Sequence, residues 1–206
     1  DWKNSMRKGA SGEGQDANPW YVALGSDFVY EAFLAARKAD PDVKLYYNDY
    51  NMDMQNKAQL VHNMVRDINN RYKTEHPEAN GRLLIEGIGM QAHYNTGTSV
   101  VNVRRSLELF KSLGVEMAIS ELDILAQTWN EYSANAGGPN PAGFMTQAKL
   151  YGELFSLFKE YSGTIKRVTL WGIADVQSWR ERGKPLLFDN NFRAKPAYYR
   201  MMEAAD

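Results

Sequence analysis

The sequence alternates four times between a short strand-like apolar run and a longer segment with helical periodicity. The strand-like runs are 43–47, 83–90, 115–119 and 165–172. The helical patterns that follow them are 54–74, 99–113, 145–158 and 195–205. Strands that alternate with helices in this way predict a parallel α/β fold, because each helix carries the chain back to start the next parallel strand.

The residues before the first strand predict a loop and one further helix. Residues 1–25 are rich in small and polar residues and are expected to be loop. Ser26 is a suitable N-cap for a helix whose apolar face is Val29, Ala32, Phe33 and Ala36.

Two parallel architectures fit this order: a doubly wound sheet and part of a (β/α)8 barrel. No G-x-G-x-x-G follows a strand, and no G-x-x-x-x-G-K-[ST] occurs. Gly87 and Gly89 fall inside a strand-like run, where they would not form a phosphate loop. The sequence therefore argues against a nucleotide-binding sheet.

Composition excludes several kinds of function. With 24 Lys+Arg against 25 Asp+Glu the formal net charge is -1, whereas non-specific nucleic-acid binding needs a basic surface. No run of about 18 apolar residues is present to span a membrane. The absence of cysteine excludes disulfides, thiolate metal sites and a cysteine nucleophile. Aromatic residues reach 12%, which a core or a carbohydrate groove would accommodate.

Polar and aromatic residues collect where the predicted strands end. They are Asn48 and Asp49, Gln91 and His93, Glu121 and Asp123, and Trp171 and Asp175. A single Asp or Asn at such a place is more often a helix cap or turn residue than a catalyst. In a parallel barrel, however, all these strand ends meet at the face that carries the active site. Their recurrence at four successive strands therefore predicts a functional site.

A metal centre is an alternative for the same side chains. Asp49, His93, Glu121, Asp123 and Asp175 offer oxygen and nitrogen donors suited to Mg, Mn or Zn. The chain has only three histidines, with no H-x-H or H-E-x-x-H spacing. The sequence therefore predicts no metal site and no cofactor.

Several segments resemble glycoside hydrolase family 10, the endo-1,4-β-xylanases. The resemblance rests on KLYYNDYN (44–51), GIGMQAH (87–93), ISELD (119–123) and WGIADVQSWR (171–180). Weaker matches are WY with LGSD (20–27), PLLFD (185–189) and KPAY (195–198). The order and spacing are those of the family, and the likeness covers nearly the whole chain.

The resemblance implies roles for individual residues. Glu121 matches the catalytic nucleophile, His93 the histidine that hydrogen-bonds it, and Asp123 the partner that orients the imidazole ring. The implied sugar-binding residues are Asn48, Tyr50, Gln91, Trp171, Trp179 and Arg180, with Arg180 supporting Trp179. Indole faces suit the C–H faces of a pyranose, and side-chain amides suit its hydroxyl groups.

The family's acid/base glutamate, in a D-V-V-N-E-type segment ending the fourth barrel strand, has no counterpart here. The resemblance therefore implies that residues 1–206 are the C-terminal half of the barrel: a loop over 1–25, then one helix and four β/α units over 26–206. The expected partners are xylan or xylo-oligosaccharides and the N-terminal half of the barrel, in the same gene product or a separate chain; a second copy is the alternative.

Three functions remain open from the sequence. The first is a retaining endo-1,4-β-xylanase whose proton donor lies outside these residues. The second is a half-barrel that binds xylo-oligosaccharides without turnover, and the third is a metal-dependent barrel enzyme. The resemblance implies a secreted or periplasmic protein. The stretch 126–142, with Trp129 and Tyr132, is expected to be a loop that either tunes substrate choice or is simply solvated.

Overall fold

The computed structural model describes residues 2–5 and 18–206. The strands are β1 (Tyr46–Asp49), β2 (Gly87–Met90), β3 (His93–Asn95), β4 (Glu116–Leu125) and β5 (Ile165–Leu170). The α-helices are α1 (Trp2–Ser5), α2 (Pro19–Leu24), α3 (Phe28–Ala39), α4 (Gln55–Glu75), α5 (Val100–Lys111), α6 (Trp129–Ser133), α7 (Pro141–Glu160) and α8 (Pro196–Ala205). Single 3-10 turns are η1 (Gly25–Asp27), η2 (Pro77–Ala79), η3 (Asp175–Gln177) and η4 (Glu181–Gly183).

The strands form one parallel sheet, as the sequence predicts. β2 lies between β1 and β4, and β5 pairs with the other side of β4. The short strand β3 continues β2 and pairs with the C-terminal part of β4. Among the described strands, β1 and β5 each have one neighbour, so both are edges of the sheet.

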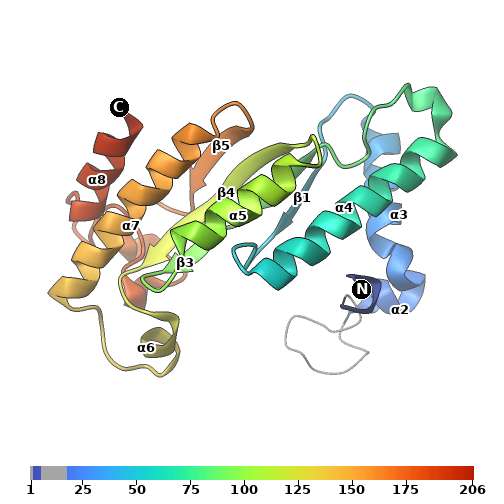
Figure 1. The fold of residues 1–206 in the computed structure, drawn as a ribbon. Coiled ribbons are helices and arrows are strands. Elements are labelled where there is room, and N and C mark those ends of the chain that lie inside the picture. The colour runs from blue at the N-terminus through green and yellow to red at the C-terminus, as the bar shows by residue number, and fades with distance from the viewer. Residues whose placement is uncertain (1, 6–17) are drawn as a thin grey trace.

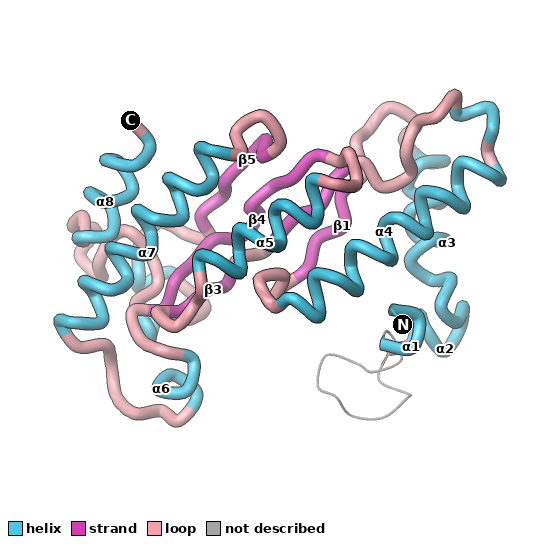
Figure 2. The backbone as a smooth tube through the Cα atoms, in the orientation of Figure 1, coloured by secondary structure: helices cyan, strands magenta, loops and turns pink. Residues whose placement is uncertain are grey.

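Three helices cover one face of this sheet, with α4, α5 and α7 side by side in front of the strands (Figures 1 and 2). Their apolar stripes supply much of the core, including Met64, Val65, Leu107, Phe110, Tyr151 and Leu154. Helix α8 packs against α7, where Gly152 allows the backbone oxygen of Arg200 to approach closely. Residues three or four apart on each helix thus reach the sheet together, which explains their helical periodicity.

The opposite face of the sheet is more polar. On it, Tyr46 donates a hydrogen bond to Glu116, and Lys44 forms an ion pair with the same carboxylate. Burial, reinforced by the Glu116 carboxylate, raises the pKa of Tyr46 to about 12. The hydrogen bond from Lys44 lowers the pKa of Glu116. This face therefore carries an ionic network between strands instead of a second apolar layer.

The register breaks where β2 passes into β3. Residues 87–90 pair with 116–119, and residues 93–95 pair with 123–125, so two residues on one strand face three on the other. Ala92, in the break, has a φ of 64°, a conformation that L-residues with a side chain rarely adopt. The break is a bulge in β4 at residues 120–122, and it lies at the predicted site.

Several element boundaries differ from the sequence prediction. Strand β1 covers 46–49 instead of 43–47, and β2 covers 87–90 instead of 83–90. Of the preceding residues, Leu45 and Glu86 still form backbone hydrogen bonds to the neighbouring segments. Helix α7 begins at Pro141, with the Asn140 side chain accepting from the N–H of Gly143. The hydroxyl of Ser26 does not cap α3; residues 25–27 form η1, and Asp27 precedes the helix without a side-chain cap.

The expected loops 1–25 and 126–142 also contain helix. Pro19–Leu24 form α2, because Asn18 accepts from the N–H groups of Trp20 and Tyr21 and proline occupies the first turn. Trp2–Ser5 form α1, and residues 1 and 6–17 lie outside the described part. In the second stretch, Thr128 and Glu131 form a capping box that starts α6.

A buried ion pair joins the residue before α8 to the 3-10 turn η3 that follows β5. Lys195 Nζ lies 2.9 Å from Asp175 Oδ2 and also donates to the backbone oxygens of Lys184 and Leu186, at 2.7 Å each. Asp175 accepts from the N–H of Leu186 at 2.8 Å. Burial raises the pKa of Asp175 and lowers that of Lys195, against their mutual attraction.

We expect Lys195→Met to lower the free energy of unfolding by about 3–5 kcal/mol, because it leaves the Asp175 carboxylate buried without its counter-charge. Urea unfolding followed by circular dichroism measures this. Lys149→Met is the matched control, since Lys149 is exposed and 3.5 Å from Glu153; its effect should stay below about 1 kcal/mol. Equal destabilisation by the two changes would contradict this role for the pair.

Candidate active site

Five of the predicted residues come together where β1 and β2 end, β3 begins and β4 bulges. Asn48 is the last residue but one of β1, Gln91 follows β2, and His93 opens β3. Glu121 and Asp123 are two apart on β4, so both side chains leave the same face of that strand. His93 lies opposite Asp123 in the strand register, which sets its ring between the two carboxylates.

Glu121 is held from two directions. The Nε2 atom of His93 is 3.2 Å from Glu121 Oε2, and the amide of Asn48 donates to Glu121 Oε1 at 2.9 Å. The hydroxyl of Ser120 donates to the Asn48 carbonyl oxygen at 2.5 Å, which fixes which end of the amide faces Glu121. Both Glu121 oxygens are therefore positioned by neighbouring side chains.

Gly89 makes room for Asn48. These two residues are paired across β1 and β2, and a Cβ atom on Gly89 would lie 2.6 Å from the Asn48 side-chain oxygen. Any larger residue at this position would displace the amide that contacts Glu121. The glycine in the strand thus has a packing role and is not part of a phosphate loop.

Asp123 is completely buried and receives three donors. His93 Nδ1 is 3.1 Å from its Oδ1 atom, Arg180 Nη1 is 3.1 Å from the same oxygen, and the indole N–H of Trp179 donates to Oδ2 at 2.9 Å. Arg180 also donates to the backbone oxygen of Tyr94 at 2.6 Å. Burial lowers the pKa of Arg180, and Asp123 acts against that effect. The ion pair compensates a carboxylate that water cannot reach.

These contacts restrict what the imidazole of His93 can do. A neutral ring donates from one nitrogen only, whereas an imidazolium donates from both. With carboxylates at both nitrogens, His93 is able to donate to both only when it carries a proton on each. The ring therefore links Glu121 to Asp123 through its position between the two carboxylates.

The predicted aromatic residues differ in their surroundings. Trp179 meets His93 edge to face, with ring centroids 5.0 Å apart, while 66% of the residue stays exposed. Trp171 directly follows β5 and is 46% exposed, and its backbone N–H donates to the backbone oxygen of Leu122 on β4. Tyr50 is 39% exposed, with Lys57 Nζ 3.8 Å from its ring centre. Indole surface therefore lies open beside the His93–Glu121 pair.

Arg180 lies behind the site and is only 3% exposed. Its guanidinium carbon is 5.6 Å from the Trp179 ring, so it supports that indole as well as Asp123. Gln91 contributes backbone bonds: its N–H donates to the oxygen of Asp49 and its oxygen accepts from the N–H of Glu121, each at 3.0 Å. Direct sugar binding by Arg180 and Gln91 stays a prediction.

Two of the candidate metal ligands have other partners. Asp49 pairs with Lys57 at 2.9 Å and accepts from the hydroxyl of Tyr47 at 2.9 Å. Asp175 belongs to the buried pair with Lys195. Over residues 2–5 and 18–206, no group of three or more His, Cys, Asp or Glu side chains is arranged to hold a metal ion.

The sequence did not predict that Ser120 and the backbone oxygen of Tyr94 take part in the hydrogen bonds of the site. Ser120 directly precedes Glu121 and would be expected on the opposite face of a regular strand, but at the bulge in β4 its hydroxyl reaches Asn48 on β1, two strands away. The only signal in the sequence is its place next to Glu121. The Tyr94 contact uses a backbone oxygen, which no residue type reveals.

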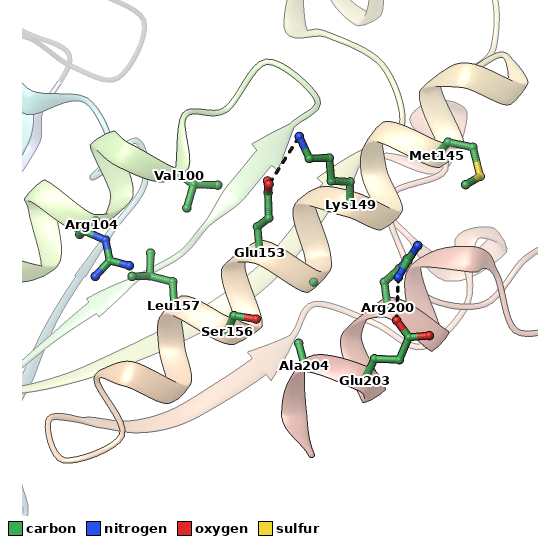
Figure 3. Close-up of a pocket in the computed structure, with 11 residues that line it drawn as sticks. Val100, Arg104, Met145, Lys149, Glu153, Ser156, Leu157, Arg200, Glu203 and Ala204 are labelled. Atoms are coloured by element: carbon green, nitrogen blue, oxygen red, sulfur yellow. Dashed lines mark hydrogen bonds and ion pairs between the residues drawn. The ribbon is translucent and has the colours of Figure 1, made fainter.

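A separate hollow lies among α5, α7 and α8 on the outer helical layer (Figure 3). Its charged residues include the pairs Lys149–Glu153 and Arg200–Glu203. None of its lining residues belongs to a strand, so it is not part of the site at the strand ends.

In the described part of the chain, no helix has the length and apolar character needed to cross a bilayer.

The model of glycosyl hydrolase family 10 matches residues 3–204. An endo-1,4-β-xylanase of Geobacillus stearothermophilus is 34% identical over 194 residues, which are 90% of this chain and 56% of that protein. A termite-gut family 10 xylanase that contains a bacterial Ig-like domain superposes with a TM-score of 0.88 at 44% identity, over 96% of this chain and 46% of the other.

An intracellular xylanase of Thermoanaerobacterium saccharolyticum, solved as a mutant bound to xylotetraose, has a TM-score of 0.76 and 35% identity, covering 88% of this chain and 51% of that one. The chain thus spans about half the length of these relatives. The parallel sheet with its outer helices is of the (β/α)8 type of these neighbours. With the family model matching almost end to end, the chain belongs to glycosyl hydrolase family 10.

Proposed function

We propose that this chain supplies the nucleophile and much of the sugar-binding surface of a retaining endo-1,4-β-xylanase. The observation that carries the proposal is the Glu121 carboxylate, positioned by His93 and Asn48 at the ends of parallel strands and flanked by exposed indole surface. The xylanase relatives support this substrate class, as does the neighbour bound to xylotetraose.

In the proposed reaction, a Glu121 oxygen attacks the anomeric carbon and forms a glycosyl ester as the glycosidic C–O bond breaks. The departing oxygen takes a proton from a carboxylic acid. Water then attacks the same carbon and gives a proton to that group, and the ester bond breaks to release Glu121. Retaining enzymes place the two carboxyl groups about 5–5.5 Å apart. Asn48 and His93 hold the Glu121 carboxylate in place, so its attack on the anomeric carbon needs no large movement of the side chain.

In this proposal the carboxylic acid that donates the proton belongs to the N-terminal half of the barrel, outside these 206 residues. Asp49 and Asp175, the other acids that follow predicted strands, are paired with Lys57 and Lys195 and so are poorly suited to replace the missing acid. Strands β1 and β5 are open edges, which suit pairing with the first half of a barrel. We propose that this half belongs to the same gene product or to a separate chain, and a second copy of this chain is the alternative.

The aromatic and amide side chains account for substrate binding in this proposal. Trp171 and Trp179 offer indole faces for pyranose rings, and Asn48 and Gln91 offer amides for hydroxyl groups. Without the complementary acid, the same surface would bind xylo-oligosaccharides and leave them intact. The secreted or periplasmic location implied by the resemblance stays a prediction; one similar structure is of an intracellular xylanase.

The Glu121→Gln change tests the nucleophile. Glutamine keeps the size and one hydrogen-bond acceptor but cannot form the ester, so xylan hydrolysis should fall by about a thousandfold or more. The assay is reducing-sugar release by the chain alone, by the longer form that includes the complementary half, and by that form with the substitution. Glu153→Gln, on the outer face of α7, is the control that should leave the rate unchanged.

Two results would overturn the account. Full activity of the 206-residue chain alone would show that the proton donor lies within it. Activity of the longer form that survives Glu121→Gln would remove this residue from the nucleophile role.

Arg180→Lys tests whether Arg180 positions Asp123 or binds sugar. Lysine keeps the charge but loses the fork that reaches both Asp123 and the Tyr94 backbone, so kcat should fall about tenfold while KM changes by less than about twofold. Steady-state kinetics of the longer form separates the two parameters, and Arg200→Lys on the exposed face of α8 is the control. A raised KM at unchanged kcat would show direct contact with substrate instead.

A further inference from the structure

Trp129 is an exposed indole on α6 that the site described above does not use. It is 55% exposed, and its ring packs against Tyr132 in a tilted arrangement, with centroids 5.8 Å apart and an interplanar angle of 34°. Since the two residues are three apart on a helix, they share one face of it. Tyr132 supports the indole from one side, and more than half of Trp129 remains open to solvent.

The helix that carries Trp129 is fastened in place. The Glu131 carboxylate accepts from the N–H and the hydroxyl of Thr128, both at 2.7 Å, and this closes the first turn of α6. Arg182 donates to the backbone oxygen of Tyr132 at 2.5 Å and to the side chain of Asn135. Its guanidinium carbon lies 4.5 Å from the Tyr132 ring centre. Trp129 is therefore held on an anchored element, so little conformational entropy is lost when a ligand binds it.

A continuous line of ring and guanidinium contacts joins Trp129 to the site. The Arg180 guanidinium carbon lies 6.0 Å from the Tyr132 ring and 5.6 Å from the Trp179 ring. Trp179 in turn meets His93 edge to face at 5.0 Å. Trp129 is thus the outer end of a series of packed planar groups that begins beside Glu121.

The chemistry of this position favours a neutral sugar ring. The two charged side chains on or bound to α6 already have partners, Glu131 in the helix cap and Arg182 at Tyr132 and Asn135. What remains is a rigid apolar ring face bordered by polar side chains, which suits the C–H face of a pyranose with its hydroxyl groups directed to water. Trp20 is also exposed, at 67%, but has no ring partner among the described residues.

We propose that Trp129 forms an accessory subsite for a sugar residue of the same xylan chain, farther from the bond that is cleaved than the residues over Trp171 and Trp179. This inference rests on the proposed function, because it assumes that the glycan lies along the strand ends. It predicts that Trp129 matters for long substrates and not for short ones.

The experiment compares Trp129→Ala with Trp20→Ala in the longer form that includes the complementary half. We expect kcat/KM for xylohexaose and polymeric xylan to fall about fivefold to tenfold in Trp129→Ala, through KM, and the value for xylotriose to stay unchanged. Trp20→Ala should match the parent on every substrate. Trp129→Phe should recover part of the loss, since a phenyl ring also stacks on Tyr132.

Binding is measured separately by titrating xylohexaose and xylotriose calorimetrically into the longer form carrying Glu121→Gln. Weaker xylohexaose binding on adding Trp129→Ala, with xylotriose unaffected, supports the subsite. An equal loss for both lengths would overturn it, because it would show that Trp129 acts through Tyr132 and Arg180. No loss for either would also overturn it. If the longer form with Glu121 intact hydrolyses neither sugar while its Glu121→Gln variant binds both, only the proposed function is contradicted.

Discussion

A buried negative charge organises the site. Asp123 has no exposed side-chain surface, so its carboxylate depends on protein donors to replace water. The donors come from β3 and from the segment after β5: the imidazole of His93, the indole N–H of Trp179 and the guanidinium of Arg180. The hydrogen bonds and ion pair to this one carboxylate orient the His93 imidazole toward Glu121. They also fix the Trp179 indole at the edge of the site and hold the Arg180 guanidinium behind it. The Glu121 carboxylate and the exposed indole of Trp179 are therefore both positioned through Asp123.

A local irregularity in the sheet makes this arrangement possible. With two residues of the β2–β3 connection facing three residues of β4, the strand carrying Glu121 and Asp123 bulges beside His93. Ala92 takes a left-handed conformation, which a regular strand would not require. Bulges change the direction of side chains and interrupt pairing, and here the change brings Ser120 to Asn48 and thereby fixes the amide that faces Glu121.

Acids at the ends of the strands serve different purposes despite similar positions in the sequence. Asp123 and Asp175 are both buried and both paired with a cation, Arg180 and Lys195 respectively. The first also contacts the imidazole beside Glu121, whereas the second accepts from the Leu186 backbone and fastens the C-terminal segment. Asp49 is a third case, occupied by Lys57 and Tyr47. Position at a strand end thus locates the acids without distinguishing their roles.

The order of strands and helices, the helical periodicity of α4, α5 and α7, and the contacts of His93 with Glu121 and Asp123 could all be predicted from the sequence. These features depend on short-range periodicity and on motifs a few residues long, which are visible in one dimension. Only the tertiary structure decided that Trp179 and Arg180 bind the Asp123 carboxylate and that Lys57 pairs with Asp49. It alone also decided that β4 bulges beside Glu121 and that residues 129–133 form an anchored helix. Each of these is a choice of partner between distant segments. Many donors in the chain could satisfy a given carboxylate, and only the packed fold determines which of them comes within hydrogen-bond distance.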